Sequence, residues 1–430
     1  MADRGVNEAV RGPAQAHGRE ACAQRGRAAG PSRGEPDGAA EAAALLGRAR
    51  DLGPQLVAWR RHLHAHPELS FQETDTAAYL AAELEAGGLR VTRPMPNAVL
   101  AEIGGRSAGP VVALRADIDA LPIPEETGLP FASRRPGVMH ACGHDGHAAI
   151  LLGASRLLAG QTALPGRVRL LFQPGEEVPP GGAGELIARG ALEGVAAICG
   201  LHLWSPLPVG AAVLTAGPAW AAADRFRAVL RGRAAHGAKP DEGVDALEAA
   251  CRCVAALQSI VSRSVSPLAP AVVTVGRMQA GEAFNVIAGS AVLEGTVRAF
   301  DEGVRQVVRA RVAAVLEHTA AAAGAELELE YVDGYPPLVN DPVVTAVVRG
   351  AAADCLGEGA VRSGPLEMAA DDFARYLRHV PGCYLSLGAT PAGSPGYPNH
   401  HPRFDIEESV LPVGAAILAT AALRLLRRPA

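Results

Sequence analysis

Short apolar runs alternate with helical patterns along much of the chain, and several of the apolar runs end in polar side chains. The run VVALRADIDALP (111–122) is followed by GRVRLLFQPGEE (166–177) and VAAICGLHLW (195–204), and each predicts a buried strand. Helical spacing of apolar residues predicts helices over 41–61, 74–86, 147–159 and 184–190. Alternation of this kind is typical of an α/β fold with parallel strands. The polar strand ends are then expected at one edge of the sheet, where such folds bind ligands.

The pattern changes near Gly217. The next stretch predicts strands and helices in an α+β order, at 225–232, 243–262, 271–281, 291–300 and 303–323. Apolar strands and helices of the first kind resume after 327, and a helix is predicted near the C-terminus. We therefore predict an α/β fold with a mixed, mostly parallel sheet flanked by helices, made by 41–216 and 331–430. An α+β (ferredoxin-like) domain over 217–330 is inserted, and a disordered leader covers 1–40.

Composition and charge narrow the class of protein. With 49% hydrophobic and 20% charged residues in 430, the chain is expected to fold into two or three globular domains. A net charge of −5 argues against a nucleic-acid partner. Seven irregularly spaced cysteines do not form a disulfide framework, which favours the cytoplasm. The apolar stretch 411–426 is shorter than a membrane span and reads as a core helix, so no membrane partner is expected.

The stretch HACGHDGHAA (140–149) concentrates side chains that can donate a lone pair. Each candidate also has an ordinary reading when taken alone. Cys142 fits a buried thiol, and a single histidine such as His202 is more often part of a core. The adjacent Glu176 and Glu177 fit a solvated charge pair. Cys142 with His144 as its base would instead fit a nucleophile pair.

Taken together, the donors at strand ends and loops favour a metal site. They are Cys142, His144, Glu177, His202 and His400. Thiolate, imidazole and carboxylate suit Zn²⁺ and, less well, Mn²⁺ or Co²⁺. Five donors are more than a closed tetrahedral site uses and fit two ions that share one bridging ligand. Thiolate and carboxylate can both bridge, so the bridge stays open at this point.

These residues resemble the dinuclear metal amidohydrolases that include hippurate hydrolases, auxin-conjugate hydrolases and N-acyl-amino-acid amidohydrolases, relatives of aminoacylase and glutamate carboxypeptidase. The likeness covers most of 55–425 in nine ordered blocks, of which CGHDGH and the closing HxPRF are the most diagnostic. The blocks are RRHLHAHPELSFQE (60–73), RADIDALP (115–122), PGVMHACGHDGHAAILLG (136–153), FQPGEE (172–177), GLH (200–202), HGAKPDEGVDAL (236–247), FNVI (284–287), GTVRAF (295–300) and HHPRFDIEE (400–408).

The resemblance implies a catalytic domain in two sequence segments and an inserted lid domain that dimerises, giving a homodimer or homotetramer. It implies that the five donors named above bind two divalent ions, with Cys142 as the bridge. Glu176 is implied as the general base, and His236 as a donor to the substrate carbonyl, reaching a neighbouring subunit's site. Asn285 and Arg298 are implied to hold a substrate carboxylate. The expected reaction is hydrolysis of small-molecule N-acyl amino acids to a carboxylic acid and an amino acid.

Other roles and readings remain beside this one. Asp117 or Asp119 is expected to orient a metal-bound histidine, and His140 and His147 are expected to support the site rather than to bind metal. Gly175, where the family usually has Ala, is expected to change little. The alternatives are a metal-free thiol nucleophile, a catalytically silent binding protein, and a dipeptidase or carboxypeptidase on the same scaffold.

Overall fold

The computed structural model describes residues 38–104, 109–161, 163–391, 393 and 396–428. Most of the predicted leader lies outside these ranges. Its last three residues are instead the start of helix α1 (Gly38–Asp51), because two alanines extend the helical run. The single helix predicted over 41–61 is two helices, since Gly53 and Pro54 interrupt it and begin α2 (Gly53–Ala65). Proline is tolerated there because the first helical turn has no use for its missing N–H.

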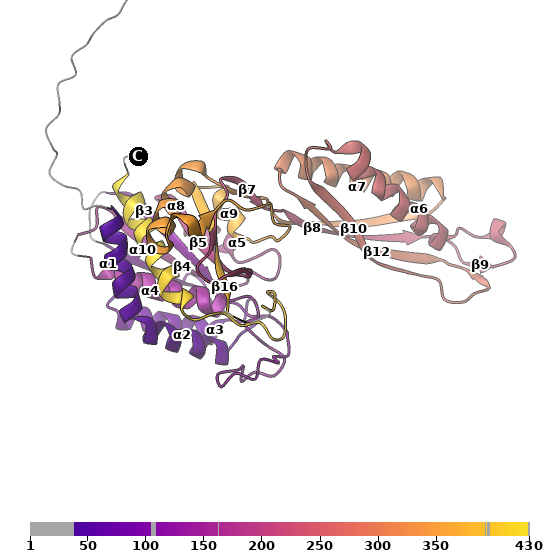
Figure 1. The fold of residues 1–430 in the computed structure, drawn as a ribbon. Helices are drawn as coiled ribbons and strands as arrows, with labels where there is room; N and C mark the ends of the chain where they lie inside the picture. The colour runs from indigo at the N-terminus through magenta and orange to yellow at the C-terminus, as the bar shows by residue number, and fades with distance from the viewer. Residues whose placement is uncertain (1–37, 105–108, 162, 392, 394–395, 429–430) are drawn as a thin grey trace, which may run out of the picture. The chain divides into compact units, whose positions relative to one another are not determined.

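The main sheet is mixed, with parallel strands at its centre (Figure 1). Its spatial order is β1 (Arg90–Thr92), β2 (Val99–Ile103), β4 (Arg167–Gln173), β3 (Val111–Asp117), β5 (Val195–Pro208), β16 (Gly382–Thr390), β6 (Ala212–Val213) and β15 (Val361–Arg362). Strand β3 pairs in parallel with β4 and β5, and β5 pairs in parallel with β16. The carboxyl ends of these four strands therefore lie at one edge, as the sequence predicts.

Alternation along the central strands decides which side chains reach that edge. All seven residues of β3 are buried, which is typical of a strand covered on both faces. One set of alternate residues enters the larger hydrophobic core, namely Val112, Leu114 and Ala116 on β3 and Cys199, Leu201 and Leu203 on β5. The intervening residues face the other side of the sheet; they include Arg115, Asp117, His202 and Trp204. Polar side chains of both strands thus share one face.

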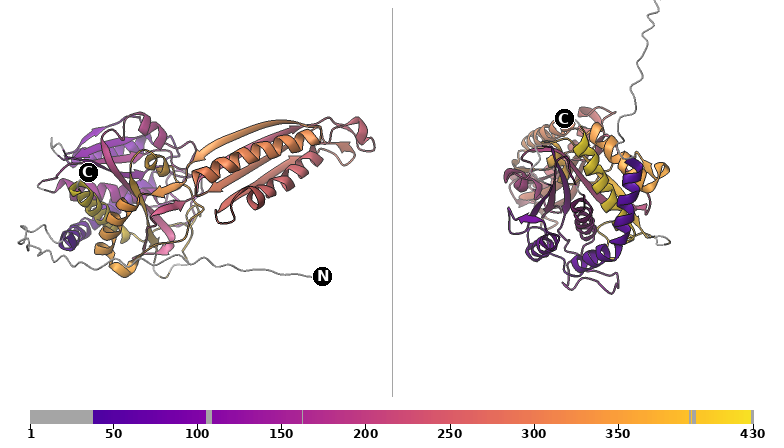
Figure 2. Two further views of the ribbon diagram at one scale, coloured as in Figure 1. Left: turned by 90° about the horizontal axis from the view of Figure 1, so that it is seen from above. Right: turned by 90° about the vertical axis from the view of Figure 1, so that its left-hand side faces the viewer.

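Helices cover both faces of this sheet (Figures 1 and 2). The larger core contains residues of α2, α3 (Thr74–Ala86), α4 (His144–Ala159), α8 (Pro342–Leu356) and α10 (Val410–Arg427), and the smaller core contains residues of α5 (Ala183–Ala188) and α9 (Phe373–Leu377). By length and composition α10 could cross a membrane, but 83% of its apolar window is buried inside the fold. It is the core helix that the sequence indicates.

A second layer has its own sheet and its own hydrophobic core. Four antiparallel strands stand in the order β10 (Ala271–Ala280), β12 (Ser290–Ala299), β8 (Ala223–Arg231) and β13 (Glu326–Tyr335). Helices α6 (Ala246–Ser259) and α7 (Glu302–Ala322) pack on this sheet. The chain order strand–helix–strand–strand–helix–strand is that of a ferredoxin-like unit. We call it the α+β layer; its independence as a domain stays a prediction.

Short strands complete the structure. Strand β7 (Gly217–Trp220) pairs with β14 (Leu338–Asn340), and β9 (Ala235–His236) pairs with β11 (Val286–Ile287).

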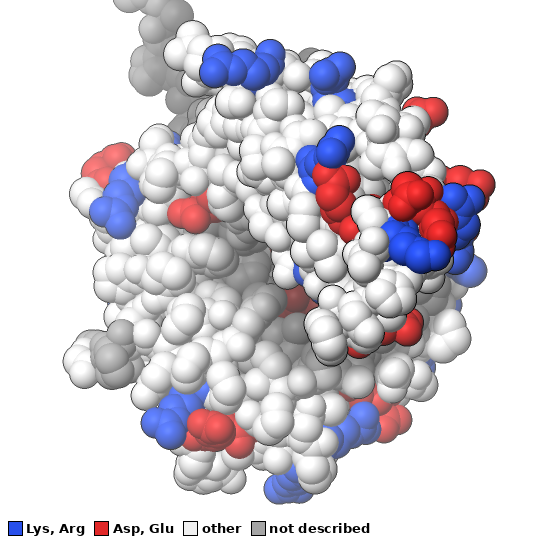
Figure 3. Space-filling model, turned by 90° about the vertical axis from the view of Figure 1, so that its right-hand side faces the viewer, with Lys and Arg blue, Asp and Glu red and all other residues white. Residues whose placement is uncertain are grey.

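The surface drawn in Figure 3 carries basic and acidic side chains interspersed over a mostly uncharged face. The six cysteines in the described part of the chain form no disulfide.

Candidate metal centre

The five donors predicted from the sequence converge on the parallel edge of the main sheet. They come from separate segments: Cys142 and His144 at the start of α4, Glu177 after β4, His202 in β5 and His400 before α10. His202 lies inside its strand rather than at the strand's end, because β5 continues along β16 to Pro208. The pairing of β3 with β5 ends at Arg115 and Gly200, and both Asp117, the last residue of β3, and His202 lie two residues further along their strands. The longer neighbouring strand therefore carries the histidine past the end of β3.

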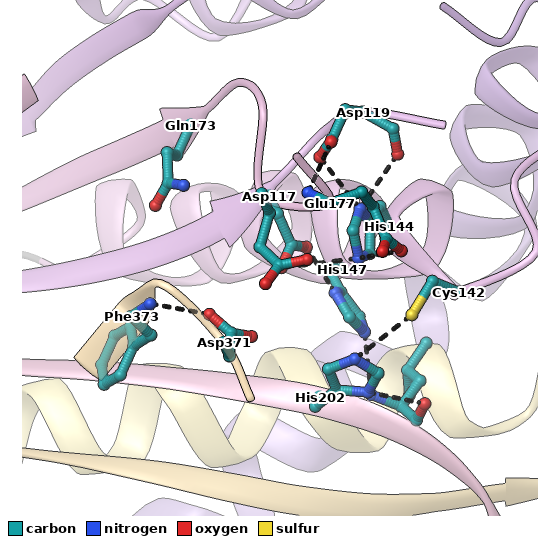
Figure 4. A network of polar contacts seen from close by, with 12 residues as sticks. Asp117, Asp119, Cys142, His144, His147, Gln173, Glu177, His202, Asp371 and Phe373 are labelled. Atoms are coloured by element: carbon teal, nitrogen blue, oxygen red, sulfur yellow. Dashed lines mark hydrogen bonds and ion pairs between the residues drawn. The ribbon is translucent and has the colours of Figure 1, made fainter. Parts of the chain in front are cut away.

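The donor atoms form two groups that share one sulfur. Single ligand atoms of Cys142, His144 and His202 lie within 4.8 Å of one another, and so do those of Cys142, Glu177 and His400. The Cys142 Sγ is 3.5 Å from His202 Nε2 (Figure 4). His400 Nε2 is 3.2 Å from a Glu177 oxygen. A pair of three-donor groups with one common thiol is the arrangement that two ions with a thiolate bridge require.

Two buried atoms in this cluster support a cation there. His144 Nε2 and Glu177 Oε1 form no hydrogen bond with the described residues and lie 3.9 Å apart, and the same Glu177 oxygen is the one 3.2 Å from His400 Nε2. Buried polar atoms are normally satisfied, so unsatisfied lone pairs among other donors fit an ion. Thiolate, imidazole and carboxylate donors suit Zn²⁺ in particular. The residues present therefore fit a divalent metal.

The environment of Cys142 argues against a thiol nucleophile. Burial, followed by the nearby Glu177 and Glu176 carboxylates, raises the pKa of this thiol well above its usual value. Reactive cysteines have the opposite surroundings, with cationic neighbours that stabilise the thiolate. A thiolate at Cys142 therefore needs the positive charge of a bound ion.

Asp119 holds two of the donors in place. His144 Nδ1 lies 2.9 Å from the Asp119 carbonyl oxygen and 3.2 Å from its carboxylate, and the Glu177 backbone N–H donates to the same side chain at 3.0 Å. Although burial raises the pKa of Asp119, hydrogen bonds from His144 and Ser70 lower it overall. The ionised carboxylate orients His144 so that Nε2 faces the other donors.

The other histidines of this stretch are not donors to the cluster. His147 Nδ1 donates to Asp117 at 2.6 Å, and its Nε2 accepts the Leu203 backbone N–H at 2.8 Å. Both ring nitrogens are therefore occupied, and His147 has no lone pair left for a metal. His140 is buried with both ring nitrogens unpartnered among the described residues, and burial lowers its pKa to about 4. Asp117 thus bonds His147 and also lies 3.7 Å from His144 Nε2, whereas Asp119 bonds His144.

Glu176 lines a cavity of about 360 Å³ beside the donors. The residues around it include Cys142, Glu177, His202, His400, Trp204, Trp220, Arg298, Tyr335, Asp371 and Asn399. Burial, followed by the carboxylates of Asp371 and Glu177, raises the pKa of Glu176 well above its usual value. The Tyr335 hydroxyl donates to the Glu176 carbonyl oxygen and fixes the loop. The adjacent glutamates therefore differ. Glu177 shares a group with Cys142 and His400, whereas Glu176 lies within 4.8 Å of donor atoms of His144 and Glu177 but belongs to neither group that contains Cys142, and its pKa is raised.

The α+β layer brings one of its three predicted residues to the cavity. Arg298 is half-buried and lines the cavity wall. Its guanidinium donates hydrogen bonds to the Thr296 hydroxyl and, at 3.1 Å, to the Val297 carbonyl oxygen, and it makes no ion pair within the described residues. His236 and Asn285 are exposed, lie together where β9 pairs with β11, and do not line this cavity. Strand β12 begins at Ser290, close to β11, and Arg298 lies eight residues further along it. Eight residues of extended strand span roughly 26 Å, which separates Arg298 from His236 and Asn285.

Three residues that the sequence analysis did not single out shape the site. The Asn399 amide donates to the carbonyl oxygens of Cys142 and Leu203, so it ties the segment before His400 to α4 and β5. Asn399 directly precedes the matched block that begins at His400, and this position is the signal that could have identified it. Trp204 could have been placed by alternation, two residues after His202 on the same face. For Tyr335 the sequence carries no such signal.

The structure corrects the expectation for Gly175. Its φ is +65°, a left-handed conformation that costs a residue with a Cβ about 1–2 kcal/mol. An added Cβ would also lie 2.4 Å from the Phe71 ring. The Phe71 ring is 44% exposed and can move aside, so the strain of the left-handed backbone conformation is the larger cost of a Cβ at this position. Alanine at this position would therefore strain the loop that carries both glutamates.

Comparison with known proteins identifies the family of this chain. Residues 113–424 match the model of peptidase family M20/M25/M40. The chain is 44% identical over 378 residues to N-acetyl-L-cysteine deacetylase of Bacillus subtilis (strain 168), covering 87% of this chain and 89% of that one. It is 36% identical to thermostable carboxypeptidase 1 of Saccharolobus solfataricus, covering 87% and 96%. A crystal structure from Bacillus subtilis, described as a dinuclear metal-binding peptidase of the M20 family, superposes with a TM-score of 0.77 at 38% identity, covering 88% and 99%. The chain therefore belongs to peptidase family M20/M25/M40.

Proposed function

We propose that the protein is a metal-dependent hydrolase that cleaves the amide bond of N-acyl amino acids, releasing a carboxylic acid and a free amino acid. The observation that carries this proposal is one cavity that combines three features. It adjoins two donor groups sharing Cys142, it contains a buried glutamate outside those two groups, and it contains an arginine that forms no ion pair with any residue the structure describes. The similarity to an N-acetyl-amino-acid deacetylase supports the same reaction.

The cofactor in this proposal is two divalent ions, Zn²⁺, Mn²⁺ or Co²⁺. Cys142, His144 and His202 would hold one, and Cys142, Glu177 and His400 the other. When bound, such ions polarise an amide carbonyl and lower the pKa of water toward about 7. Asp119 keeps His144 and Glu177 aligned for this task.

Glu176 is the proposed general base. It faces the cavity, and its raised pKa favours taking a proton from the attacking water and later returning it to the leaving amine. Tyr335 holds its backbone, so the carboxylate is positioned before substrate binds. Arg298 is proposed to pair with the carboxylate of the amino-acid part, because its planar guanidinium can bind a carboxylate with two hydrogen bonds.

A carboxypeptidase-like activity is the second candidate. The C-terminal residue of a peptide also carries a carboxylate that Arg298 could hold, and a carboxypeptidase is among the relatives. The two candidates differ in the acyl side of the bond, which is a peptide in one case and a plain acyl group in the other.

We also propose that the α+β layer forms a homodimer or homotetramer. His236 and Asn285 are exposed and absent from the cavity of their own chain. A second copy could bring them to it, where His236 would donate to the substrate carbonyl. Phe284, fully exposed beside Asn285, would then be covered by the partner.

Metal removal and substrate choice test the main proposal together. Chelation should abolish hydrolysis of N-acetyl and N-benzoyl amino acids, and Zn²⁺, Mn²⁺ or Co²⁺ should restore it. Arg298→Ala should raise KM for these acids much more than for the matching amides, which lack the carboxylate. Full activity in protein shown by elemental analysis to be metal-free would refute the metal role. Equal effects of Arg298→Ala on acids and amides would refute carboxylate recognition.

A further inference from the structure

A second cavity of about 380 Å³ adjoins the one that holds Glu176. Trp204 and Trp220 line both cavities, and their ring centroids are 5.2 Å apart. The same two rings lie 5.5 and 5.3 Å from the His202 imidazole. The pair of indoles is therefore the shared wall between the candidate metal centre and the second cavity.

The second cavity lies over the same face of the main sheet as His202. In the parallel pairing of β5 with β16, His202 is registered with Ser386. Ser386 is registered in turn with Val213 on β6. Registered residues on neighbouring strands point to the same face, and Ser386 and Val213 both line the second cavity. A ligand held at His202 that extends across the sheet toward β6 and β15 would enter this space.

The walls of the second cavity favour an apolar occupant. Beyond the indoles, the apolar side chains of Pro206, Leu207, Val213, Ala219 and Pro365 form part of the wall, and polar residues, including Glu367, form much of the remainder. Two of the deeper polar side chains, those of Asn340 and Tyr384, already have partners. Asn340 bonds the backbone of Thr215 and Tyr384, and the Tyr384 hydroxyl donates to Asp371 at 2.6 Å. Arg362, at the outer end, is exposed, so the cavity opens to water there.

The two indoles differ in their freedom to move. Trp220 is 5% exposed, and its backbone forms a bridge with Glu367. Trp204 is half-buried, and its indole N–H makes no hydrogen bond with the described residues. A side chain with exposed surface and no polar anchor changes rotamer more easily than a packed one.

We propose that the second cavity receives the tail of the substrate's acyl group, with Trp204 as a movable partition, so that the enzyme prefers medium-chain aliphatic or aryl-alkyl acyl groups. This inference rests on the proposed function and adds the class of acyl group to it. The amide carbonyl lies at the donors, the amino-acid carboxylate lies at Arg298, and the acyl tail crosses the sheet face toward Leu207 and Val213.

The consequence is a dependence of kcat/KM on acyl length. Each methylene that enters an apolar cavity should raise kcat/KM about fourfold. The rise should stop once the tail reaches the water-exposed end at Arg362. A series of N-acetyl, N-butanoyl, N-hexanoyl, N-octanoyl and N-dodecanoyl derivatives of one amino acid measures this directly.

Cavity-filling variants locate the effect. Leu207→Trp and Pro365→Trp fill the space from two different segments of the chain, and neither residue lines the cavity of Glu176. Leu366→Trp is the matched control, because Leu366 is next to Pro365 and 41% exposed but does not line the second cavity. Both filling variants should lower kcat/KM for the octanoyl substrate at least tenfold and leave the acetyl substrate within twofold. The control should leave both substrates unchanged.

Each outcome decides between named possibilities. A flat length series in the wild type, or equal losses on acetyl and octanoyl substrates in two folded filling variants, would overturn the acyl-tail inference while leaving amide hydrolysis intact. Failure of the metal-loaded wild type to cleave any member of the series would overturn the proposed function. Thermal melting of each variant separates folding defects from cavity effects, and the second filling variant serves if the first does not fold.

Discussion

Replacing Arg60 by methionine should destabilise the protein by about 3 kcal/mol or more. The guanidinium is 1% exposed and donates to three carboxylates: Asp145 at 2.9 Å, Asp405 at 2.7 Å and Glu408 at 3.1 Å. Removing one partner of a buried ion pair costs about 3–5 kcal/mol, because a charge is left without compensation. Asp405 and Glu408 are 31% and 18% exposed and keep contact with water. Asp145 is 1% exposed and therefore accounts for most of the loss. Because Asp145 keeps its contact with His64 Nδ1 at 2.8 Å, the loss is expected at the lower end of that range.

Arg61→Met is the matched control. Arg61 is the next residue on α2 and also pairs with Glu408, at 2.7 Å, but its side chain is 48% exposed. Exposed pairs contribute about 0–1 kcal/mol. Denaturant unfolding of the two variants should thus differ by at least about 2 kcal/mol. Losses of similar size in both variants would show that burial does not govern this network, and the reasoning would be wrong.

The Arg60 effect should also depend on pH in a defined direction. Although burial raises it, the pKa of Asp145 is lowered overall by Arg60 and His64. A lowered folded-state pKa contributes stability that is present above the unfolded value, about 3.9, and is lost as the pH falls through the folded value. The difference between wild type and Arg60→Met should therefore be full near pH 6 and shrink below about pH 4. A constant difference over this range would contradict the role of Asp145.

Two further predictions separate the roles of the site residues. Glu176→Gln should lower kcat by roughly 10²–10⁴ with metal content unchanged, whereas Glu177→Gln should lower metal content measured by elemental analysis; identical behaviour of the two would refute the division between them. His236→Ala and Glu176→Gln should each be inactive alone, yet mixed and reassembled chains should recover part of the activity, because one mixed site has both groups intact. No recovery in a demonstrated mixed oligomer would place His236 outside the partner's site.

The central strands and the donor cluster were predictable because each leaves a local signal. Strands β3, β4 and β5 appear as apolar runs that end near polar residues, and α3 matches its predicted bounds of 74–86. Parallel pairing then requires their carboxyl ends to meet, which brings donors far apart in sequence to one edge. The break between α1 and α2 was missed because the helical period continues on both sides of Gly53.

Features set by register and by short elements were not predictable. Arg298 and Asn285 look alike in sequence as members of matched blocks, and only the length of β12 separates them in space. The second cavity depends on β6 and β15, which have two residues each and therefore show no periodicity. The φ of Gly175 reflects the packing of a loop against Phe71 and leaves no pattern beyond the glycine itself.

The spacing of the donors along the chain has a consequence for biosynthesis. His400 follows His202 by nearly 200 residues. At roughly 5–20 residues per second, a ribosome needs about 10–40 s to add that length. Throughout that interval the nascent chain contains Cys142, His144, Glu177 and His202 but not yet His400, the fifth donor. On the proposed ligand set, one ion position can be complete during translation, whereas the second closes only after the C-terminal segment has been released and folded.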